Sequence, residues 1–454
     1  MLKKKKGFNK VQKSLQCKLL REGFDLTATK ARYNEAVAFY FALVNTFPEH
    51  VLSDDCELSG WYAYEALTCK GSQYEFRIDI PAVLRRSAIR KAIGAWCSWN
   101  SNYQKWLARP RKHKHHKPPV QPRQFNFSPG YDAGMWKEDT GNSIVLKILV
   151  KGQWKWIKFH YLSPNYQHDD NGLNGWHKAS SSLVIKASNA FITFTLQKYI
   201  PATGGCQKLL AKGSVRVLGV DIDLDRYIAI LSVLEIAAND KVVEVARRFI
   251  KQTHHTQLRK RDLGLIAIRM KKTGIVHKGF CSKRWAKISQ KEKEVGRAIA
   301  RQIVEFAQHW QCSVICFEHL LNLKPCKGKY SKLSNQKRAY WLKSKVFHEV
   351  NRVAFQDYGI LTTRVNPRDT SRLDPWGQEL ARLDNYSGKL AIHLIQQGQL
   401  ENIYQKGANF VVNVKTSYSA HSGLNAARNI GLKAILRHRT QAVFVLPKAS
   451  DKVI

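Results

Sequence analysis

Two acidic residues stand at the ends of apolar runs, where metal chemistry is readily built. Asp221 ends the run VRVLGVD, and Glu318 ends the run SVICFE. Acids at the ends of two hydrophobic strands can meet at one edge of a sheet, where their oxygens suit Mg²⁺ or Mn²⁺. Two such cations about 3.5–4 Å apart activate water and stabilise the leaving oxygen of a phosphodiester. On pattern alone, the alternative is two surface carboxylates on loops that follow strands.

The histidine and cysteine residues predict neither a metal site nor a disulfide framework. His113, His115 and His116 lie in the basic, proline-rich segment 105–123 without an obvious fourth ligand, which favours a linker. The nine cysteines are scattered singly, include no CxxC pair and are odd in number. This usage fits a reducing cytoplasm.

The charge balance predicts a polyanionic partner. The 454 residues carry 75 Lys and Arg against 34 Asp and Glu, a formal charge of +41. Such an excess is costly in self-repulsion unless a polyanion neutralises it. The 12 Trp and 17 Tyr suit bases that stack on aromatic rings. Nucleic acid is therefore the first candidate partner, and an anionic membrane surface is the second.

Membrane insertion and export are not expected. No apolar run approaches the roughly 20 residues that span a bilayer. Met1 is followed by a lysine cluster without the apolar segment of a secretory signal. We expect a protein of the prokaryotic cytoplasm, associated with the nucleoid.

The order of hydrophobic patterns predicts a multidomain α+β protein. Apolar residues at helical spacing predict long helices over 28–47 and 82–99. Alternating β-branched and aromatic residues over 144–198 predict an antiparallel, barrel-like sheet. After residue 215, strands alternate with helices, which predicts an α/β sheet.

Four segments resemble one nuclease family. GVDIDLDRYIAI is similar to the first RuvC-type motif of the TnpB transposon proteins and the related type V CRISPR effectors, and ICFEHLLNL is similar to the second. VNPRDTSR resembles the segment before their zinc-binding insert, and AHSGLNAARNIG resembles the third motif, normally D-x-N-A-A-x-N-I. The resemblance is specific over residues 215–435 and architectural before that. It implies an RNA-guided DNA-binding protein with a Mg²⁺-dependent nuclease site at Asp221 and Glu318.

The resemblance also implies a domain layout. The last domain would be RuvC-like, with an RNase H fold and a degenerate zinc-finger-like insert at about 372–420. The predicted domains are a basic arm or first barrel strand at 1–24, a helical recognition domain at 25–117, a wedge-like β-barrel at 118–214 and the RuvC-like domain at 215–454.

The third motif departs from the family pattern at an acid. Gly423 stands where the third catalytic aspartate is expected, two residues before Asn425. Glycine has no side chain, so it cannot bind metal or orient water. Asp221 and Glu318 alone would hold Mg²⁺ weakly. Because two-metal chemistry needs both ions together, we expect activity to fall by orders of magnitude.

Two other acids are candidates to replace the missing one. Asp223 lies two residues beyond Asp221, so strand alternation would place both on one face, although it also suits a turn. Asp384, in RLDNYSGKL, would come from the insert, although it also suits the N-terminus of a helix.

The zinc cysteines of the family are missing too. RLDPWG follows Ser371 where a CxxC pair is expected, and FVVNVKTSYS replaces the second pair. We therefore predict no structural zinc, and we expect the segment GKLAIHLIQQGQ to form a helix that packs on the sheet.

The predicted function is RNA-guided DNA binding with cleavage lost or much weakened. The expected partners are a guide RNA, a double-stranded DNA target and, in some settings, transposition or regulatory proteins. One alternative is an active Mg²⁺-dependent RNA-guided endonuclease with a relocated third carboxylate. The other is an RNA-binding accessory protein of a mobile element.

Basic segments are the predicted nucleic-acid contacts, because an A-form heteroduplex is held by its backbone rather than by its sequence. Trp154, Trp156 and Trp176 are predicted to stack on RNA bases, although at least one suits a buried core position. The residues predicted to contact phosphates are Arg85, Arg86, Arg90, Lys91, Arg109, Arg111, Lys112, Lys114, Arg259, Lys260, Arg261, Lys271, Lys272, Lys283 and Arg284.

Overall fold

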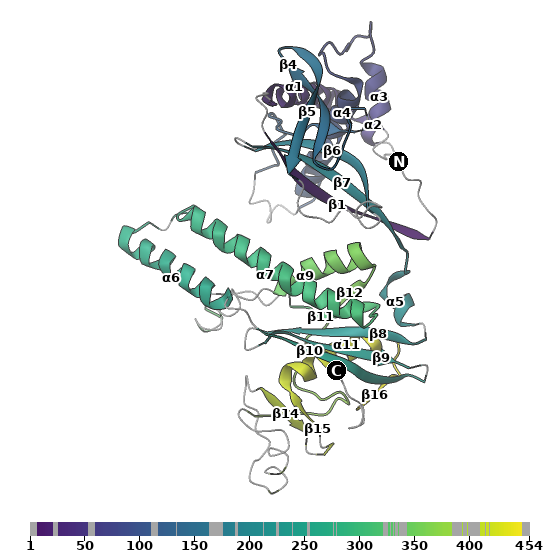
Figure 1. Ribbon diagram of the computed structural model, residues 1–454, viewed down its shortest axis with the longest axis vertical. Coiled ribbons are helices and arrows are strands. Elements are labelled where there is room, and N and C mark those ends of the chain that lie inside the picture. The colour runs from purple at the N-terminus through teal and green to yellow at the C-terminus, as the bar shows by residue number, and fades with distance from the viewer. Residues whose placement is uncertain are drawn as a thin grey trace. The chain divides into compact units, whose positions relative to one another are not determined.

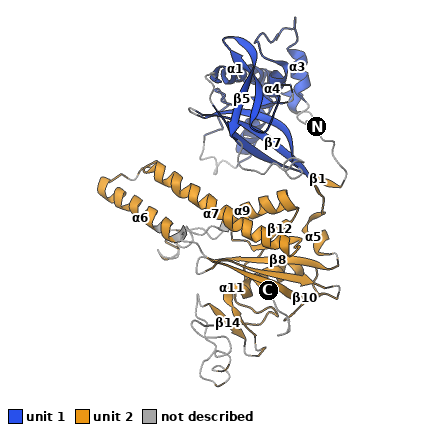
Figure 2. Cartoon of the chain, in the orientation of Figure 1, with its two compact units in different colours: residues 1–6, 10–199 blue, residues 7–9, 200–454 orange. Residues whose placement is uncertain are grey.

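The computed structural model divides into two compact units, residues 1–6 with 10–199 and residues 7–9 with 200–454 (Figure 2). The predicted division into four domains stays a prediction. The structure describes residues 7–20, 26–52, 60–109, 117–132, 134–162, 176–186, 189–211, 213–223, 227–237, 239–251, 255–275, 277, 279–320, 326, 328–329, 331, 335, 343–383, 393, 397, 409–413, 415–416 and 418–446.

A seven-stranded sheet forms one part of the first unit, in the order β2-β6-β7-β1-β5-β4-β3 (Figure 1). Lys151 and Gly152, both with positive φ, close the β4–β5 hairpin, because a two-residue hairpin turn of this kind requires left-handed backbone. The strands are β1 (Phe8–Leu19), β2 (Gly130–Tyr131), β3 (Trp136–Lys137), β4 (Ser143–Val150), β5 (Gln153–Leu162), β6 (His177–Lys186) and β7 (Asn189–Pro201).

This sheet is open where a barrel was predicted. Among the described residues no ladder joins β2 to β3, so the sheet does not close. Both edge strands are only two residues long, which leaves little backbone for a closing ladder. The antiparallel arrangement predicted over 144–198 is confirmed for the β4–β5 and β6–β7 pairs.

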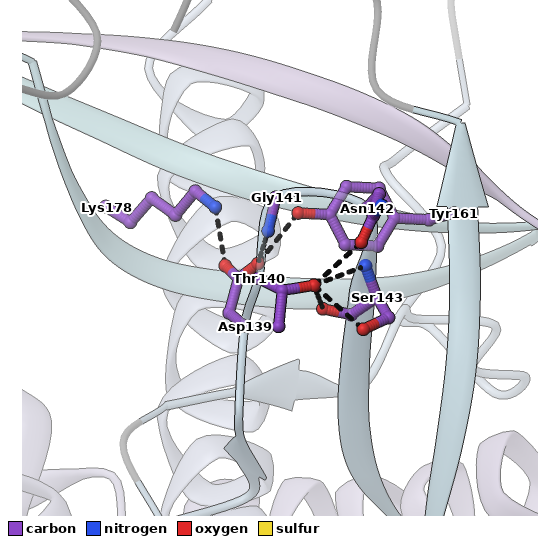
Figure 3. A network of polar contacts seen from close by, with 7 residues as sticks. All are labelled: Asp139, Thr140, Gly141, Asn142, Ser143, Tyr161 and Lys178. Atoms are coloured by element: carbon purple, nitrogen blue, oxygen red, sulfur yellow. Dashed lines mark hydrogen bonds and ion pairs between the residues drawn. The ribbon is translucent and has the colours of Figure 1, made fainter. Parts of the chain in front are cut away.

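Figure 3 shows a polar network that ties one turn of this sheet to two strands. Asp139 is nearly buried and accepts hydrogen bonds from the Tyr161 hydroxyl at 2.7 Å and the Gly141 amide at 3.0 Å. Lys178 on β6 forms an ion pair with the same carboxylate at 2.5 Å. Burial and the nearby Asp139 raise the pKa of Tyr161 well above its ordinary value, so its hydroxyl stays a donor.

Helices also belong to the first unit. The helices predicted over 28–47 and 82–99 are confirmed as α1 and α4, and the indole of Trp96 on α4 donates to Asn45 on α1 at 3.3 Å. The hydroxyl of Thr29 accepts from the Leu149 amide at 2.9 Å, which fixes α1 on β4. The helices are α1 (Thr27–Thr46), α2 (Glu49–Leu52), α3 (Trp61–Leu67) and α4 (Ala82–Leu107).

The second unit is built on a six-stranded sheet in the order β12-β11-β8-β9-β10-β16 (Figure 1). β8, β11 and β12 run parallel, β8, β9 and β10 are antiparallel neighbours, and β16 runs parallel to β10. Its strands are β8 (Val215–Ile222), β9 (Tyr227–Ile236), β10 (Lys241–Lys251), β11 (Val314–Glu318), β12 (Leu361–Val365) and β16 (Val443–Val445). A separate sheet contains β13 (Ala381–Leu383), β14 (Phe410–Asn413) and β15 (Tyr418–His421).

Helices cover both faces of the six-stranded sheet. Leu218 and Val220 of β8 pack in one buried cluster with α7 and α9, whereas Val217 packs in another with α11. This alternation along β8 directs Asp221 toward α11. The helices are α5 (Gly205–Leu210), α6 (His255–Thr273), α7 (Ser282–His309), α9 (Lys343–Val353), the π-helical turn η4 (Ala354–Tyr358) and α11 (Ser422–Leu436).

Glycine allows α11 to lie directly on β8. A Cβ atom on Gly219 would be 2.0 Å from the carbonyl oxygen of Ala427, and one on Gly431 would be 2.8 Å from Cδ1 of Leu234. A side chain at either crossing point would push the helix away from the sheet. Since Gly219 lies two residues before Asp221, this crossing sets the position of the first turn of α11 beside that carboxylate.

The structure is a mixed α+β protein, as predicted. Within the described residues, no helix is both long enough and apolar enough to cross a membrane. The helix predicted over GKLAIHLIQQGQ falls outside the described residues, apart from positions 393 and 397.

Candidate functional site

The structure brings Asp221 and Glu318 together at the carboxyl ends of two neighbouring parallel strands. β8 and β11 pair in register, with Val220 opposite Phe317, and each acid is the next residue. Cys316 lies in the buried cluster on the α11 face, so Glu318, two residues on, also faces α11. The predicted meeting of the two carboxylates is therefore observed.

Both carboxyl groups are hard to ionise. Burial raises the pKa of Asp221 well above its ordinary value, and the charges of Glu318 and Asp223 add to this, while Arg382 acts in the opposite direction. Burial also raises the pKa of Glu318, although a hydrogen bond from Thr370 opposes the shift. Two desolvated like charges side by side destabilise each other, and a bound cation would relieve that repulsion.

Gly423 lies directly beside this pair, in the first turn of α11. A Cβ atom on Gly423 would be 3.1 Å from Oδ2 of Asp221. Position 423, where the third motif of the family has its aspartate, therefore lies next to the Asp221 carboxylate. The glycine supplies no ligand there.

The residues that the structure describes at this site do not fit a pair of divalent cations. Among the described residues, no group of three or more His, Cys, Asp or Glu is arranged to hold a metal ion. Asp223 is described and acts on Asp221 as a neighbouring charge, but it does not complete such a group. Asp384 lies outside the described residues. Two carboxylates alone provide too few oxygen ligands for two-metal chemistry.

Sequence reasoning missed His421, which caps α11 at the site. Its Nδ1 accepts a hydrogen bond from the amide of Gly423 at 3.1 Å. Its ring meets those of Tyr227 and Phe249 edge-on, with centroids 5.7 and 5.6 Å apart. Burial and the charge of Arg382 lower the pKa of His421, so the ring stays neutral and can accept. Its position directly before the helix of the third motif could have indicated this role, but histidine is not among the residues preferred as N-caps.

The asparagines of the third motif hold the segment that contacts Glu318. Asn425 and Asn429 are one helical turn apart and share a face of α11. Asn429 donates to the carbonyl oxygens of Thr370 and Leu373 at 2.9 and 2.7 Å, and Asn425 donates to that of Leu373 at 2.9 Å. Thr370 in turn donates its hydroxyl to Glu318. The helix thus holds the residue that contacts Glu318, while its own first turn lies beside Asp221.

A buried ion pair fixes α11 to β10. Arg428 pairs with Glu244, which also accepts from Ser232 at 2.8 Å, and Arg428 donates to the Tyr418 hydroxyl at 3.0 Å. Both charged side chains are almost fully buried. Because each is paired and hydrogen-bonded, the desolvation cost is offset, and the orientation of the helix is fixed.

The two segments where zinc cysteines were expected lie together without cysteine. Asp374 accepts from the amides of Trp376 and Gln378 at 3.0 and 2.8 Å, while Asn413 accepts from the amide of Lys415 at 3.0 Å. The side chains meet at 2.7 Å, where the Asn413 amide donates to Asp374. Both are nearly buried, with 2% and 5% of their surfaces exposed. Each thus shapes its own turn and binds the other turn.

The predicted phosphate contacts on α4 are partly engaged by acids. Arg85 and Arg86 both form ion pairs with Glu65, at 3.0 and 3.1 Å. Arg90 lies 3.8 Å from Asp132 and, with Lys91, lines a groove of about 560 Å³ between α4 and residues 119–127. Arg109 is exposed, and Arg111, Lys112, Lys114 and the three histidines of the linker lie outside the described residues.

On α6 and α7, acids pair with two of the predicted residues. Arg259 forms an ion pair with Glu292, and Arg284 forms one with Asp262 at 3.2 Å. These pairs join the two helices, so both arginines have a structural role. The predicted residues with exposed side chains are Arg261, Lys271, Lys272 and Lys283, and Lys260 also lies on α6.

Of the three tryptophans, only Trp156 is well exposed, at 40%. Lys137 and Lys147 lie over its ring, 5.0 and 5.8 Å from the centroid. Trp176 is buried, and Trp154 is partly covered and donates to the carbonyl oxygen of Asp79 at 3.4 Å. Trp156 is therefore the one that has both an open ring and cations beside it.

Comparison with known proteins finds similarity of fold. Residues 13–150 match the Aq_aa04 family, and no curated protein sequence matches the chain. Cas12i1 in its R-loop complex before target DNA cleavage aligns with a TM-score of 0.53 and 12% identity, over 91% of this chain and 65% of that chain. The complex after cleavage gives 0.51 and 12%, over the same shares. The Cas12f1–sgRNA–target DNA complex gives 0.46 and 15%, over 89% of this chain and 81% of that one.

The solved structures aligned above are thus Cas12 effectors of type V. At 12% identity the likeness to Cas12i1 concerns the fold. The chain spans about two thirds of the length of Cas12i1.

Proposed function

We propose that the protein is a guide-RNA-directed DNA-binding protein of the TnpB and type V effector kind, with a RuvC-like domain that cleaves DNA poorly or not at all. The observation that carries this proposal is the glycine at position 423, whose Cβ would lie 3.1 Å from Oδ2 of Asp221. A nuclease of this architecture needs a carboxylate there to complete two-metal coordination.

The partners follow from charge and fold. A formal charge of +41 calls for a polyanion, and the fold resembles that of Cas12i1, which was solved in an R-loop complex. In this proposal the guide RNA reads the target by base pairing, and the protein holds the heteroduplex by its backbone. The bound complex then blocks transcription or recruits transposition or regulatory proteins.

The test measures binding and cleavage separately. RNA that co-purifies with the protein is sequenced to define the guide, and a plasmid carrying the matching target is incubated with the complex and Mg²⁺. We expect guide-dependent binding of target DNA and no cleavage in the time that an active type V effector cuts the same plasmid fully.

Two outcomes contradict this proposal. Efficient cleavage by the wild type would establish an endonuclease with a relocated acid, for which Asp223 and Asp384 are the candidates. RNA binding without guide-programmed DNA binding would establish an accessory RNA-binding protein.

A further inference from the structure

Ile230 fills the space beside Gly423 where a side chain would begin. On β9 it is the direct cross-strand partner of Asp221. A Cβ atom on Gly423 would be 2.3 Å from Cδ1 of Ile230, whereas carbon atoms in contact stay about 3.5–4.0 Å apart. Any side chain at position 423 therefore overlaps the end of Ile230 with its first atom.

Ile230 has little room to move away. Its side chain is 1% exposed and packs with Leu424 and Ala427 of α11. The rings of Tyr227 and Phe249 close the same cluster, with centroids 5.0 Å apart. β9 pairs with β8 on one side and β10 on the other, so its backbone is held as well. In such a packed interior, an added carbon forces strained rotamers or a shift of the backbone.

Backbone conformation does not explain the glycine. Gly423 lies inside α11 and is not among the residues with positive φ, so an alanine would suit its backbone. The obstacle is side-chain packing: the severe overlap is with the isoleucine methyl group at 2.3 Å, and Oδ2 of Asp221 at 3.1 Å is a milder one.

We infer that Ile230 and Gly423 act together to keep this site without a third carboxylate, so that an acid restored at position 423 alone does not rebuild a metal centre. This inference rests on the proposed function, because it concerns the acid whose loss that proposal invokes. Valine keeps the branched shape of isoleucine and lacks only Cδ1, the overlapping atom. Ile230→Val is therefore the change that should make room.

A double-mutant cycle on stability tests the overlap without any metal. In EDTA, Gly423→Ala should lower the melting temperature by several degrees in the wild type and much less in the Ile230→Val background. The matched control is Gly264→Ala on α6, where a Cβ would meet nothing within 4 Å; its effect should be the same in both backgrounds. Additive effects for Ile230→Val and Gly423→Ala would overturn the inference.

A second measurement tests metal binding. Mg²⁺ should raise the melting temperature of Ile230→Val/Gly423→Asp by several degrees, because a ligand that binds only the folded state stabilises it. Gly423→Asp alone should show a smaller rise, and Ile230→Val alone should match the wild type. An equal rise for Gly423→Asp and the double variant would overturn the inference.

Plasmid cleavage separates this inference from the proposed function. Efficient cleavage by the wild type would contradict the proposed function. It would not change the result of the double-mutant cycle on stability. If the effects of Ile230→Val and Gly423→Ala on stability are additive, the inference is contradicted, but the proposed lack of cleavage is not affected.

Discussion

At the scale of single residues, two carboxyl groups that the fold forces together dominate the candidate site. Asp221 and Glu318 face the same helix from adjacent strands, and burial and mutual repulsion raise the pKa of Asp221. The folded protein therefore binds a proton at Asp221 more tightly than the unfolded chain does. Its ionisation at neutral pH costs stability, which is typical of functional rather than structural acids.

Asp221→Asn should stabilise the metal-free protein at neutral pH. The pKa of an aspartate in the unfolded chain is about 3.9, and that of Asp221 in the folded protein is higher. The free energy of unfolding therefore falls as pH rises from the unfolded pKa through the folded pKa. Above both pKa values, the ionised carboxylate lowers stability by the full amount. Asparagine removes this cost, and we expect a melting temperature about 2–4 °C higher at neutral pH, with no gain below both pKa values. Thermal unfolding in EDTA across this pH range measures it.

The control for this prediction is an exposed acid on α7. Glu305→Gln removes a charge from a side chain that is 56% exposed, so it should leave the pH dependence nearly unchanged. A loss of stability in Asp221→Asn at neutral pH would show that the carboxylate makes favourable contacts that outweigh its burial.

At the scale of elements, the insert is joined by hydrogen bonds at the place where metal-binding cysteines were expected. The turn at Asp374, before β13, and the turn at Asn413, after β14, meet through the 2.7 Å bond between these side chains. Trp376 packs edge-on against Tyr418 of β15, with centroids 5.6 Å apart. A buried polar pair of this kind specifies one arrangement of the two turns.

Exchanging the two side chains tests this cross-link. Asp374→Asn turns an amide donor toward the Asn413 donor, and Asn413→Asp brings two carboxylates together, so each single change should cost about 1–3 kcal/mol. The double variant Asp374→Asn/Asn413→Asp restores one donor and one acceptor while keeping the oxygens that shape both turns. Urea unfolding should show that it regains at least half of the loss.

Metal analysis of the wild type complements this exchange. The hydrogen-bonded cross-link predicts stability that EDTA does not change. Stoichiometric zinc in the purified protein, or a double variant less stable than either single one, would contradict it.

At the scale of the whole molecule, the net charge is the main property. With +41 spread over both units, binding to nucleic acid should release many counterions and weaken steeply with salt. Several predicted phosphate contacts instead hold the fold together, such as Arg259 with Glu292. The exposed lysines and arginines are therefore the better candidates for contact with the backbone of RNA or DNA.

Variants of Trp156 and of the neighbouring Lys147 should distinguish the contribution of base stacking to RNA binding from that of charge. Trp156→Ala should weaken RNA binding by about 1–3 kcal/mol, the value of one stacked base, with little change in salt dependence. Lys147→Gln should instead lower the slope of log affinity against log salt by about 1. Fluorescence anisotropy over a salt series measures both, with Val443→Ala, at an exposed position on β16, as control. If Trp156→Ala kept the full affinity for RNA and changed the slope of log affinity against log salt, stacking on Trp156 would be contradicted.

The sequence by itself determined the α+β class, the long helices, the antiparallel hairpins, the basic character and the strand-end acids. These depend on local periodicity and composition, which any stretch of chain carries in its own residues. It also marked Gly423 as the odd residue of a motif. A seven-stranded sheet that stays open was not predicted, because closure depends on how short the edge strands β2 and β3 are.

Only the tertiary structure decided what surrounds that glycine. Ile230 reaches it from another strand, β9, and Thr370 reaches Glu318 from a loop that α11 holds. No local pattern encodes these contacts, because they arise where β8, β9 and α11 cross at a distance that Gly219 permits. The physical reason is packing. Ile230 and Gly423 are about 200 residues apart in the chain, and only the folded arrangement of β9 and α11 brings them into one buried space.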